Sequence, residues 1–82
     1  MSLDQLKPGQ AGRVLDIAGV GELRRRLLDL GLRRGEIVTM IKAAPLRDPL
    51  QVSLGYGHIS IRRSEASLIS VEVLLDGKGN DK

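Results

Sequence analysis

A single helical pattern most constrains the fold of this 82-residue chain. Within residues 21–35, Leu23, Leu27 and Leu30 recur at helical spacing and form one apolar stripe, which predicts that all three pack on the rest of the protein. Gly31 follows the last of these leucines, where a left-handed residue can end the helix in a Schellman motif. The other folded segments have strand or turn patterns, so we expect a mainly β protein.

Five segments are typical of strands, because they alternate apolar and polar residues or are rich in β-branched residues. They are residues 12–17, 37–41, 50–54, 58–62 and 69–74. The β-branched run at residues 37–41 predicts a buried strand. Gly55-Tyr56-Gly57 should form a three-residue hairpin loop, and Ser64 should cap a single helical turn. This order favours a small five-stranded SH3-like barrel with one α-helix inserted after the first strand and covering an open end. The alternative is an OB-type barrel, which usually carries its helix between the third and fourth strands.

The amino-acid composition excludes several classes of function. Cysteine is absent, which excludes disulfides, thiolate nucleophiles, iron–sulfur clusters and cysteine-based zinc sites, and fits the cytosol. Tyr56 is the only aromatic residue, which excludes the stacking platforms that bind single-stranded nucleic acid. The start has no signal-peptide pattern, and no apolar run is long enough to span a membrane. We expect a cytoplasmic protein with one domain over residues 1–75 and a disordered tail over residues 76–82.

Arginines are concentrated on the predicted helix and the turn after it. The cluster consists of Arg24, Arg25, Arg26, Arg33 and Arg34. With a formal net charge of +3, the chain could attract an acidic protein surface or nucleic acid. No recognised nucleic-acid-binding motif accompanies the cluster, which favours a solvated face or a protein contact. Glu22 is spaced to pair with Arg26 on the helix.

A second candidate contact is the segment 44–49. Pro45 and Pro49 restrict its backbone, so it should be a stiff loop that presents Leu46 and Arg47. Rigid loops lose little entropy on docking, and arginine is enriched in interface hot spots. The predicted partner-binding residues are therefore Arg24, Arg25, Arg33, Arg34, Leu46 and Arg47.

Residues for chemistry or metal binding are sparse. His58 is the only histidine and is a weak candidate metal ligand, since no second ligand lies at a close spacing such as His-x-His. There is no nucleophile–histidine–carboxylate constellation and no Gly-x-x-x-x-Gly-Lys nucleotide loop. Gly19-Val20-Gly21 reads as a strand-to-helix turn rather than a phosphate loop. We expect no enzymatic activity and no cofactor.

Several short motifs follow one another along the chain. They are Leu6-Lys7-Pro8-Gly9, then Arg26-Leu27-Leu28-Asp29-Leu30-Gly31-Leu32 with Gly35, then Ala44-Pro45-Leu46 with Asp48-Pro49, and Ile61-Arg62-Arg63 with Glu65-Ala66. In this order and spacing they resemble the FeoA family, small cytosolic proteins of bacterial ferrous iron uptake, and the resemblance covers nearly the whole folded region. Two positions depart from the family pattern: Arg34 stands where the family often has proline, and Arg47 where it often has glycine.

The resemblance implies an SH3-like barrel that works with the membrane GTPase transporter FeoB. It also implies transition metal ion binding as a family-level property, for which this sequence shows no ligand set. The predicted function is thus a non-enzymatic accessory protein that docks on the cytosolic part of a FeoB-like transporter and reaches the membrane only through it. The alternative is a nucleic-acid- or ribosome-associated basic module of the same fold, because one barrel can serve several functions.

Overall fold

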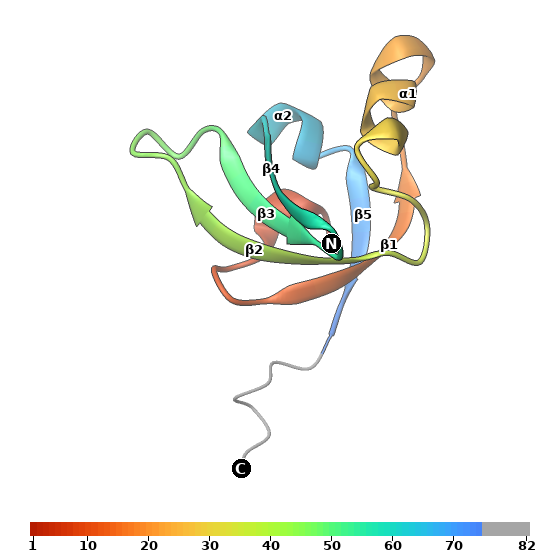
Figure 1. The fold of residues 1–82 in the computed structure, drawn as a ribbon. Helices are drawn as coiled ribbons and strands as arrows, with labels where there is room; N and C mark the ends of the chain where they lie inside the picture. Colours follow the sequence, from red (N-terminus) through yellow and green to blue (C-terminus); the bar gives the residue numbers. More distant parts are fainter. Residues whose placement is uncertain (75–82) are drawn as a thin grey trace.

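The computed structural model describes residues 1–74, which form five strands, one nine-residue helix and two single-turn helices (Figure 1). In chain order they are η1 (Leu3–Gln5), β1 (Ala11–Ile17), α1 (Gly21–Asp29), β2 (Ile37–Ala43), β3 (Leu50–Leu54), β4 (Gly57–Ile61), α2 (Arg63–Ala66) and β5 (Ile69–Val73). The five predicted strands are confirmed, with ends that differ by no more than two residues. The predicted tail, residues 76–82, lies outside the described residues, so this prediction and the domain boundary at residue 75 stay untested.

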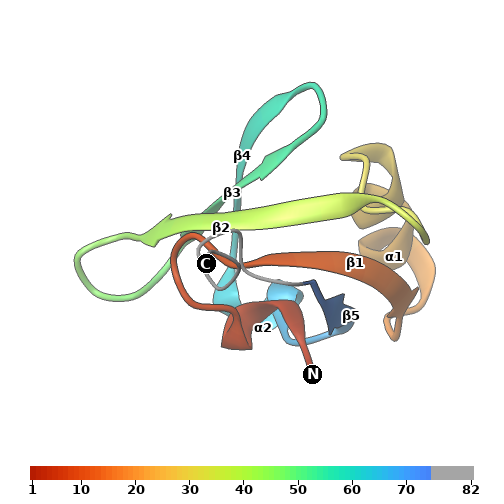
Figure 2. The same cartoon turned by 90° about the horizontal axis from the view of Figure 1, so that it is seen from below.

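The strands form one antiparallel sheet in the order β4-β3-β2-β1-β5. The register shifts between Val14 and Asp16 on β1 and between Met40 and Lys42 on β2. Such irregularities bend a strand and increase its twist, and here the sheet curls around the core (Figure 2). The expected SH3-like arrangement is confirmed, with α1 between β1 and β2, although β4 and β5 do not pair to close the barrel. The helix of an OB-type barrel would have followed the third strand.

The core is aliphatic and is built from both ends of the described chain. Its fully buried larger side chains are Leu3, Val14, Leu27, Leu32, Val38, Leu50, Val52, Ile61, Ile69 and Val71. Of the nine residues of α1, all of them described, Leu27 alone is buried. Leu30 is half-buried against the core, whereas Leu23 is 36% exposed. The prediction that all three leucines pack on the rest of the protein is wrong for Leu23, because only the C-terminal end of α1 reaches the barrel and its first turn projects outward (Figure 1).

The predicted end of the helix is confirmed. Gly31 has a φ of +102°, which glycine adopts without the steric penalty of a Cβ atom. The Gly31 N–H donates to the Leu28 carbonyl over 2.9 Å, and the Leu32 N–H donates to the Leu27 carbonyl over 3.1 Å. This pair of bonds is the Schellman motif, and it places Leu32 beside Leu27 in the core.

Three local predictions need correction. Ile37, in the strand expected to be buried, is 39% exposed. The side chains of β2 alternate between the core and the solvent, and only Val38 and Met40 are buried. Leu54 pairs with Gly57, so the hairpin loop has two residues rather than three. Ser64 does not cap α2, because α2 starts at Arg63 and its N-cap residue is Arg62.

Candidate functional site

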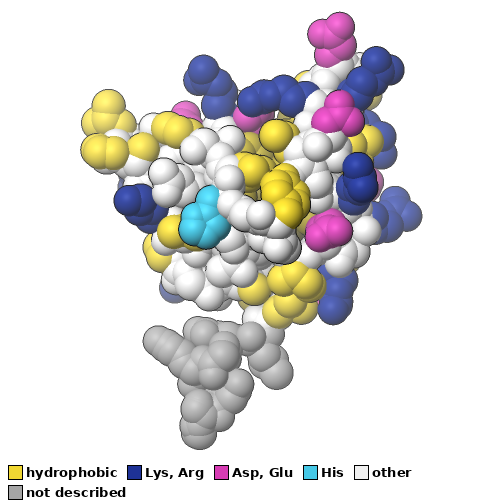
Figure 3. Space-filling model, in the orientation of Figure 1, with side chains coloured by type: hydrophobic (Ala, Val, Ile, Leu, Met, Phe, Trp, Pro, Cys, Tyr) yellow, Lys and Arg dark blue, Asp and Glu magenta, His cyan; other side chains and the backbone are white. Residues whose placement is uncertain are grey.

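The arginines of the predicted cluster lie around α1 and the turn after it, and Figure 3 shows Lys and Arg side chains gathered there. Arg24 and Arg34 line one hollow of about 240 Å³ together with Leu28, Ile17 and Asp16. Arg34 is partly held in place. Its Nε donates to the Leu15 carbonyl over 3.1 Å, and its Nη2 lies 3.8 Å from the Asp16 carboxylate. Arg25 and Arg33 are exposed. The structure therefore brings Arg24 and Arg34 together at one hollow.

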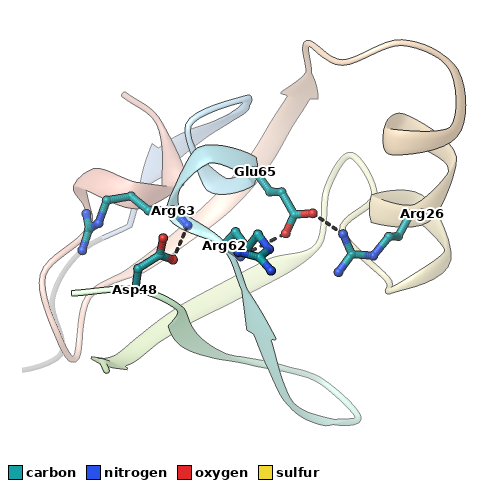
Figure 4. Close-up of polar contacts among 5 residues, drawn as sticks. All are labelled: Arg26, Asp48, Arg62, Arg63 and Glu65. Atoms are coloured by element: carbon teal, nitrogen blue, oxygen red, sulfur yellow. Dashed lines mark hydrogen bonds and ion pairs between the residues drawn. The ribbon is translucent and has the colours of Figure 1, made fainter. Parts of the chain in front are cut away.

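Arg26 is different, because it turns toward the barrel. Its guanidinium forms an ion pair with the Glu65 carboxylate on α2 (Figure 4) rather than with Glu22 as its spacing suggests. Glu65 is only 6% exposed, and its other carboxylate oxygen accepts the Arg62 backbone N–H over 3.0 Å. A buried carboxylate costs much less when it is paired and hydrogen-bonded. Arg26 and Glu65 thus join α1 to α2.

Sequence reasoning did not assign Glu65 a partner, although it lies in the last motif of the family resemblance. The signal that was available is its position two residues after Arg63, at the third position of a short helix, where a glutamate can bond back to the backbone. The second partner, Arg26, is 39 residues away in sequence, and no local pattern connects the two.

The loop between β2 and β3 is held by hydrogen bonds at both ends. The Ala44 N–H donates to the Pro49 carbonyl over 2.9 Å, and the Arg47 N–H to the Ala44 carbonyl over 2.7 Å. Arg63 supports the loop from α2, since its N–H donates to Asp48 Oδ1 and its Nε to the Arg47 carbonyl, each over 2.9 Å. These bonds agree with the predicted stiffness of segment 44–49.

At its tip, this loop presents Leu46, which is 89% exposed (hydrophobic side chains project there in Figure 3). Arg47 has a φ of +70°, a left-handed conformation that is unfavourable for a residue with a Cβ atom. This explains why glycine suits the position. Beside the loop, a hollow of about 470 Å³ runs toward η1 and is lined by both polar and apolar residues, among them Asp4, Leu6, Met40 and Arg63.

The structure separates the two predicted contact regions. The β2–β3 loop and α1 lie at opposite ends of the molecule in both ribbon views (Figures 1 and 2). Leu46 and Arg47 therefore do not form one patch with the arginines of α1. A partner that touches both regions must extend along the whole molecule or contact it at two points.

One more hollow, of about 300 Å³, lies between α1 and the end of β4. It is lined by Arg26, Asp48, Pro49, Ser60 and Arg62. Its two guanidinium groups come from different elements, α1 and the start of α2, and no motif in the sequence predicts that they share a site (Figure 4).

The weak metal candidate, His58, lies exposed on β4 opposite Ser53. Within residues 1–74, no three His, Asp or Glu side chains gather as metal ligands would. Over the same residues, no helix has the length and apolar content needed to cross a bilayer.

Comparison with known proteins identifies relatives over almost the whole described chain. The sequence model of the FeoA domain matches residues 1–73. A curated relative is the Fe(2+) transport protein A/Fe(2+) transporter FeoB fusion protein of Porphyromonas gingivalis, with 34% identity over 74 residues. The match covers 90% of this chain but 9% of the fusion protein, so the chain spans about a tenth of that relative's length.

Two solved structures share the fold. The FeoA protein of Chlorobium tepidum is 40% identical with a TM-score of 0.85, and the match covers 92% of this chain and 71% of that one. The zinc-complexed FeoA of Stenotrophomonas maltophilia, described as a procaryotic SH3 domain protein, is 30% identical with a TM-score of 0.77. That match covers 88% of this chain and 89% of the other.

Proposed function

This chain belongs to the FeoA domain family, and we propose that it is a non-enzymatic accessory protein of ferrous iron uptake that docks on the cytosolic part of a FeoB-like transporter. The observation that carries the proposal is the fused relative, in which a segment similar to this chain and FeoB form one polypeptide. Fusion raises the effective concentration of two modules for each other, which is useful where the modules bind. A separate chain of the same family would make that contact non-covalently, in the cytoplasm.

The arginine surface of α1 and its following turn is the first proposed contact. Arg24, Arg25, Arg33 and Arg34 are all exposed. Arginine pairs with carboxylates through a planar fork while its stem packs on apolar groups. Together with the net charge of +3, this surface suits an acidic region of the transporter.

Leu46 and Arg47 form the second proposed contact. A large apolar side chain at 89% exposure has no packing role in this chain, and the hydrogen-bonded loop holds it in place before binding. Preorganisation of this kind reduces the entropy that docking costs. Because the two contacts lie at opposite ends of the molecule, their contributions to binding should be additive.

Binding to the purified cytosolic region of a FeoB-like transporter from the same organism tests the proposal. Leu46→Ala and the double substitution Arg33→Ala with Arg34→Ala should each weaken binding by about tenfold, the effect of losing a contact worth 1.4 kcal/mol. Arg13→Ala is the matched control, because Arg13 is an exposed arginine on β1 that pairs with Glu72 and is not among the proposed contact residues.

The alternative function is tested with the same protein. A basic module for nucleic acid would bind duplex DNA or RNA with a steep dependence on salt concentration. Such binding, together with no detectable affinity for the transporter region, would contradict the proposal.

Iron uptake in cells that lack the native protein is the functional test. Cells complemented with Leu46→Ala or with the double arginine variant should take up less iron, whereas removal of residues from 76 onward should change uptake little. Circular dichroism checks that each variant is folded. Full uptake with both surface variants, and none with the truncated chain, would place the contact elsewhere.

A further inference from the structure

The outer edge of β4 is an unpaired strand edge. In the order β4-β3-β2-β1-β5, the two end strands, β4 and β5, differ in how their outer edges are covered. The N-terminus covers part of the β5 edge, since Ser2 pairs with Ser70 and the Val71 N–H donates to the Met1 carbonyl over 2.8 Å. Among the strands that the structure describes, β3 alone pairs with β4.

The hairpin geometry determines which backbone groups this edge presents. Leu54 and Gly57 are paired directly beside the two-residue loop, so they exchange the first hydrogen bonds of the hairpin. In antiparallel pairs, hydrogen-bonded and non-hydrogen-bonded positions alternate. The N–H and C=O groups of His58 and Ser60 therefore point away from β3, toward the open side.

β4 lacks three of the features by which proteins usually protect such an edge. Residues 57–61 contain no proline and no charged residue, and their register with β3 has no shift. Charges, prolines and bulges are the common devices against unwanted pairing. A regular, uncharged edge with two outward-facing residues is a template on which an extended segment can add as a strand.

The charges beside this edge define what kind of segment fits. Ser60 lines the hollow of about 300 Å³ whose walls carry the guanidinium groups of Arg26 and Arg62. The Arg26 side chain is 55% exposed although it pairs with Glu65, so N–H donors remain accessible on it. Arg62 is exposed, and its guanidinium forms no ion pair within residues 1–74.

The acidic groups of the same region are already engaged. Asp48 accepts the Arg63 N–H over 2.9 Å, and the Glu65 carboxylate accepts bonds from Arg26 and from the Arg62 backbone (Figure 4). The hollow therefore offers a surplus of positive donors at the end of β4. A carboxylate is the group of a protein segment that guanidinium forks bind through paired, charge-assisted hydrogen bonds.

We propose that the β4 edge binds an extended acidic segment of the partner as a sixth strand, with a carboxylate of that segment between Arg26 and Arg62. This inference rests on the proposed function, in which the partner is the cytosolic region of a FeoB-like transporter. Backbone hydrogen bonds to His58 and Ser60 supply the pairing, and the two arginines select an acidic sequence. Five residues of such a segment would match β4 in length.

Two substitutions, each with a control variant, separate these contributions. Ser60→Pro removes an outward N–H, which an edge strand tolerates, and should weaken binding of the transporter's cytosolic region by about tenfold. Ser60→Ala keeps that N–H and should lose much less. Arg62→Glu should weaken binding at least as much as Ser60→Pro, whereas Arg13→Glu on β1 should not. Thermal unfolding of each variant checks the fold.

Amide hydrogen exchange of the wild-type chain tests the strand pairing without any substitution. In the free protein, the N–H groups of His58 and Ser60 should exchange rapidly, while Ile59, which bonds to β3, is protected. In the complex with the transporter region, exchange at His58 and Ser60 should slow by about tenfold or more.

The outcomes distinguish this inference from the proposed function. If the wild-type chain does not bind the transporter region, both are overturned. If it binds, but Ser60→Pro and Arg62→Glu bind equally well and the two amides stay rapid, the β4 edge is not the contact and the proposed function stands. Protection of these amides that rises with the concentration of this chain alone would mean that a second copy occupies the edge, which also overturns the inference.

Discussion

Replacing Leu27 with alanine should lower the free energy of unfolding by about 2–5 kcal/mol. Leu27 is fully buried and packs in the core with Leu32, beyond the end of the helix. The substitution removes three carbon groups, each contributing about 0.8 kcal/mol of transfer free energy. The cavity that remains adds a further cost. Because a domain of this length is stable by roughly 4–12 kcal/mol, the loss would be a large fraction of the total.

Urea unfolding followed by circular dichroism measures this loss. Leu23→Ala is the matched control, since it is the same substitution on the same helix at a side chain that is 36% exposed. We expect it to cost less than about 1 kcal/mol, because little apolar area leaves the core. The reasoning would be refuted if Leu27→Ala unfolded at the same urea concentration as the parent, or if Leu23→Ala were equally damaging. The first result would mean that α1 does not pack through its C-terminal end, and the second that its first turn packs on the barrel as well.

Three further substitutions test local features by thermal unfolding. Glu65→Ala should cost about 1–3 kcal/mol, because it removes the buried acceptor of the Arg62 N–H and a partly buried ion pair; an unchanged midpoint would show that this network adds nothing to stability. Gly31→Ala should cost more than about 1 kcal/mol, since φ is +102° and the new Cβ would lie 2.8 Å from a Tyr56 ring carbon; wild-type stability would contradict both the backbone strain and the clash. Arg47→Gly should instead stabilise the chain by about 1 kcal/mol, because glycine has no Cβ atom and adopts this left-handed backbone conformation without steric cost. A lower midpoint would contradict this.

Local patterns sufficed where short-range sterics and periodicity decide the structure. Alternation and β-branched runs placed the five strands to within two residues, and Gly31 after a leucine pattern marked a helix end that the hydrogen bonds confirm. The prolines of segment 44–49 likewise indicated a loop whose backbone bonds to itself. The family was also readable, because its motifs keep their order and spacing along residues 1–73.

By itself, the sequence determined the order of the elements, the helix end and the family, since each depends on residues close together along the chain. Only the tertiary structure decided which apolar side chains are buried. Helical spacing places Leu23 on the same face as Leu27, but it does not show how far the barrel extends beneath that face. It also decided that Arg26 pairs with Glu65, 39 residues away, and that the β4 edge stays open beside two arginines. These contacts depend on how the curled sheet brings distant segments together, which no local pattern encodes.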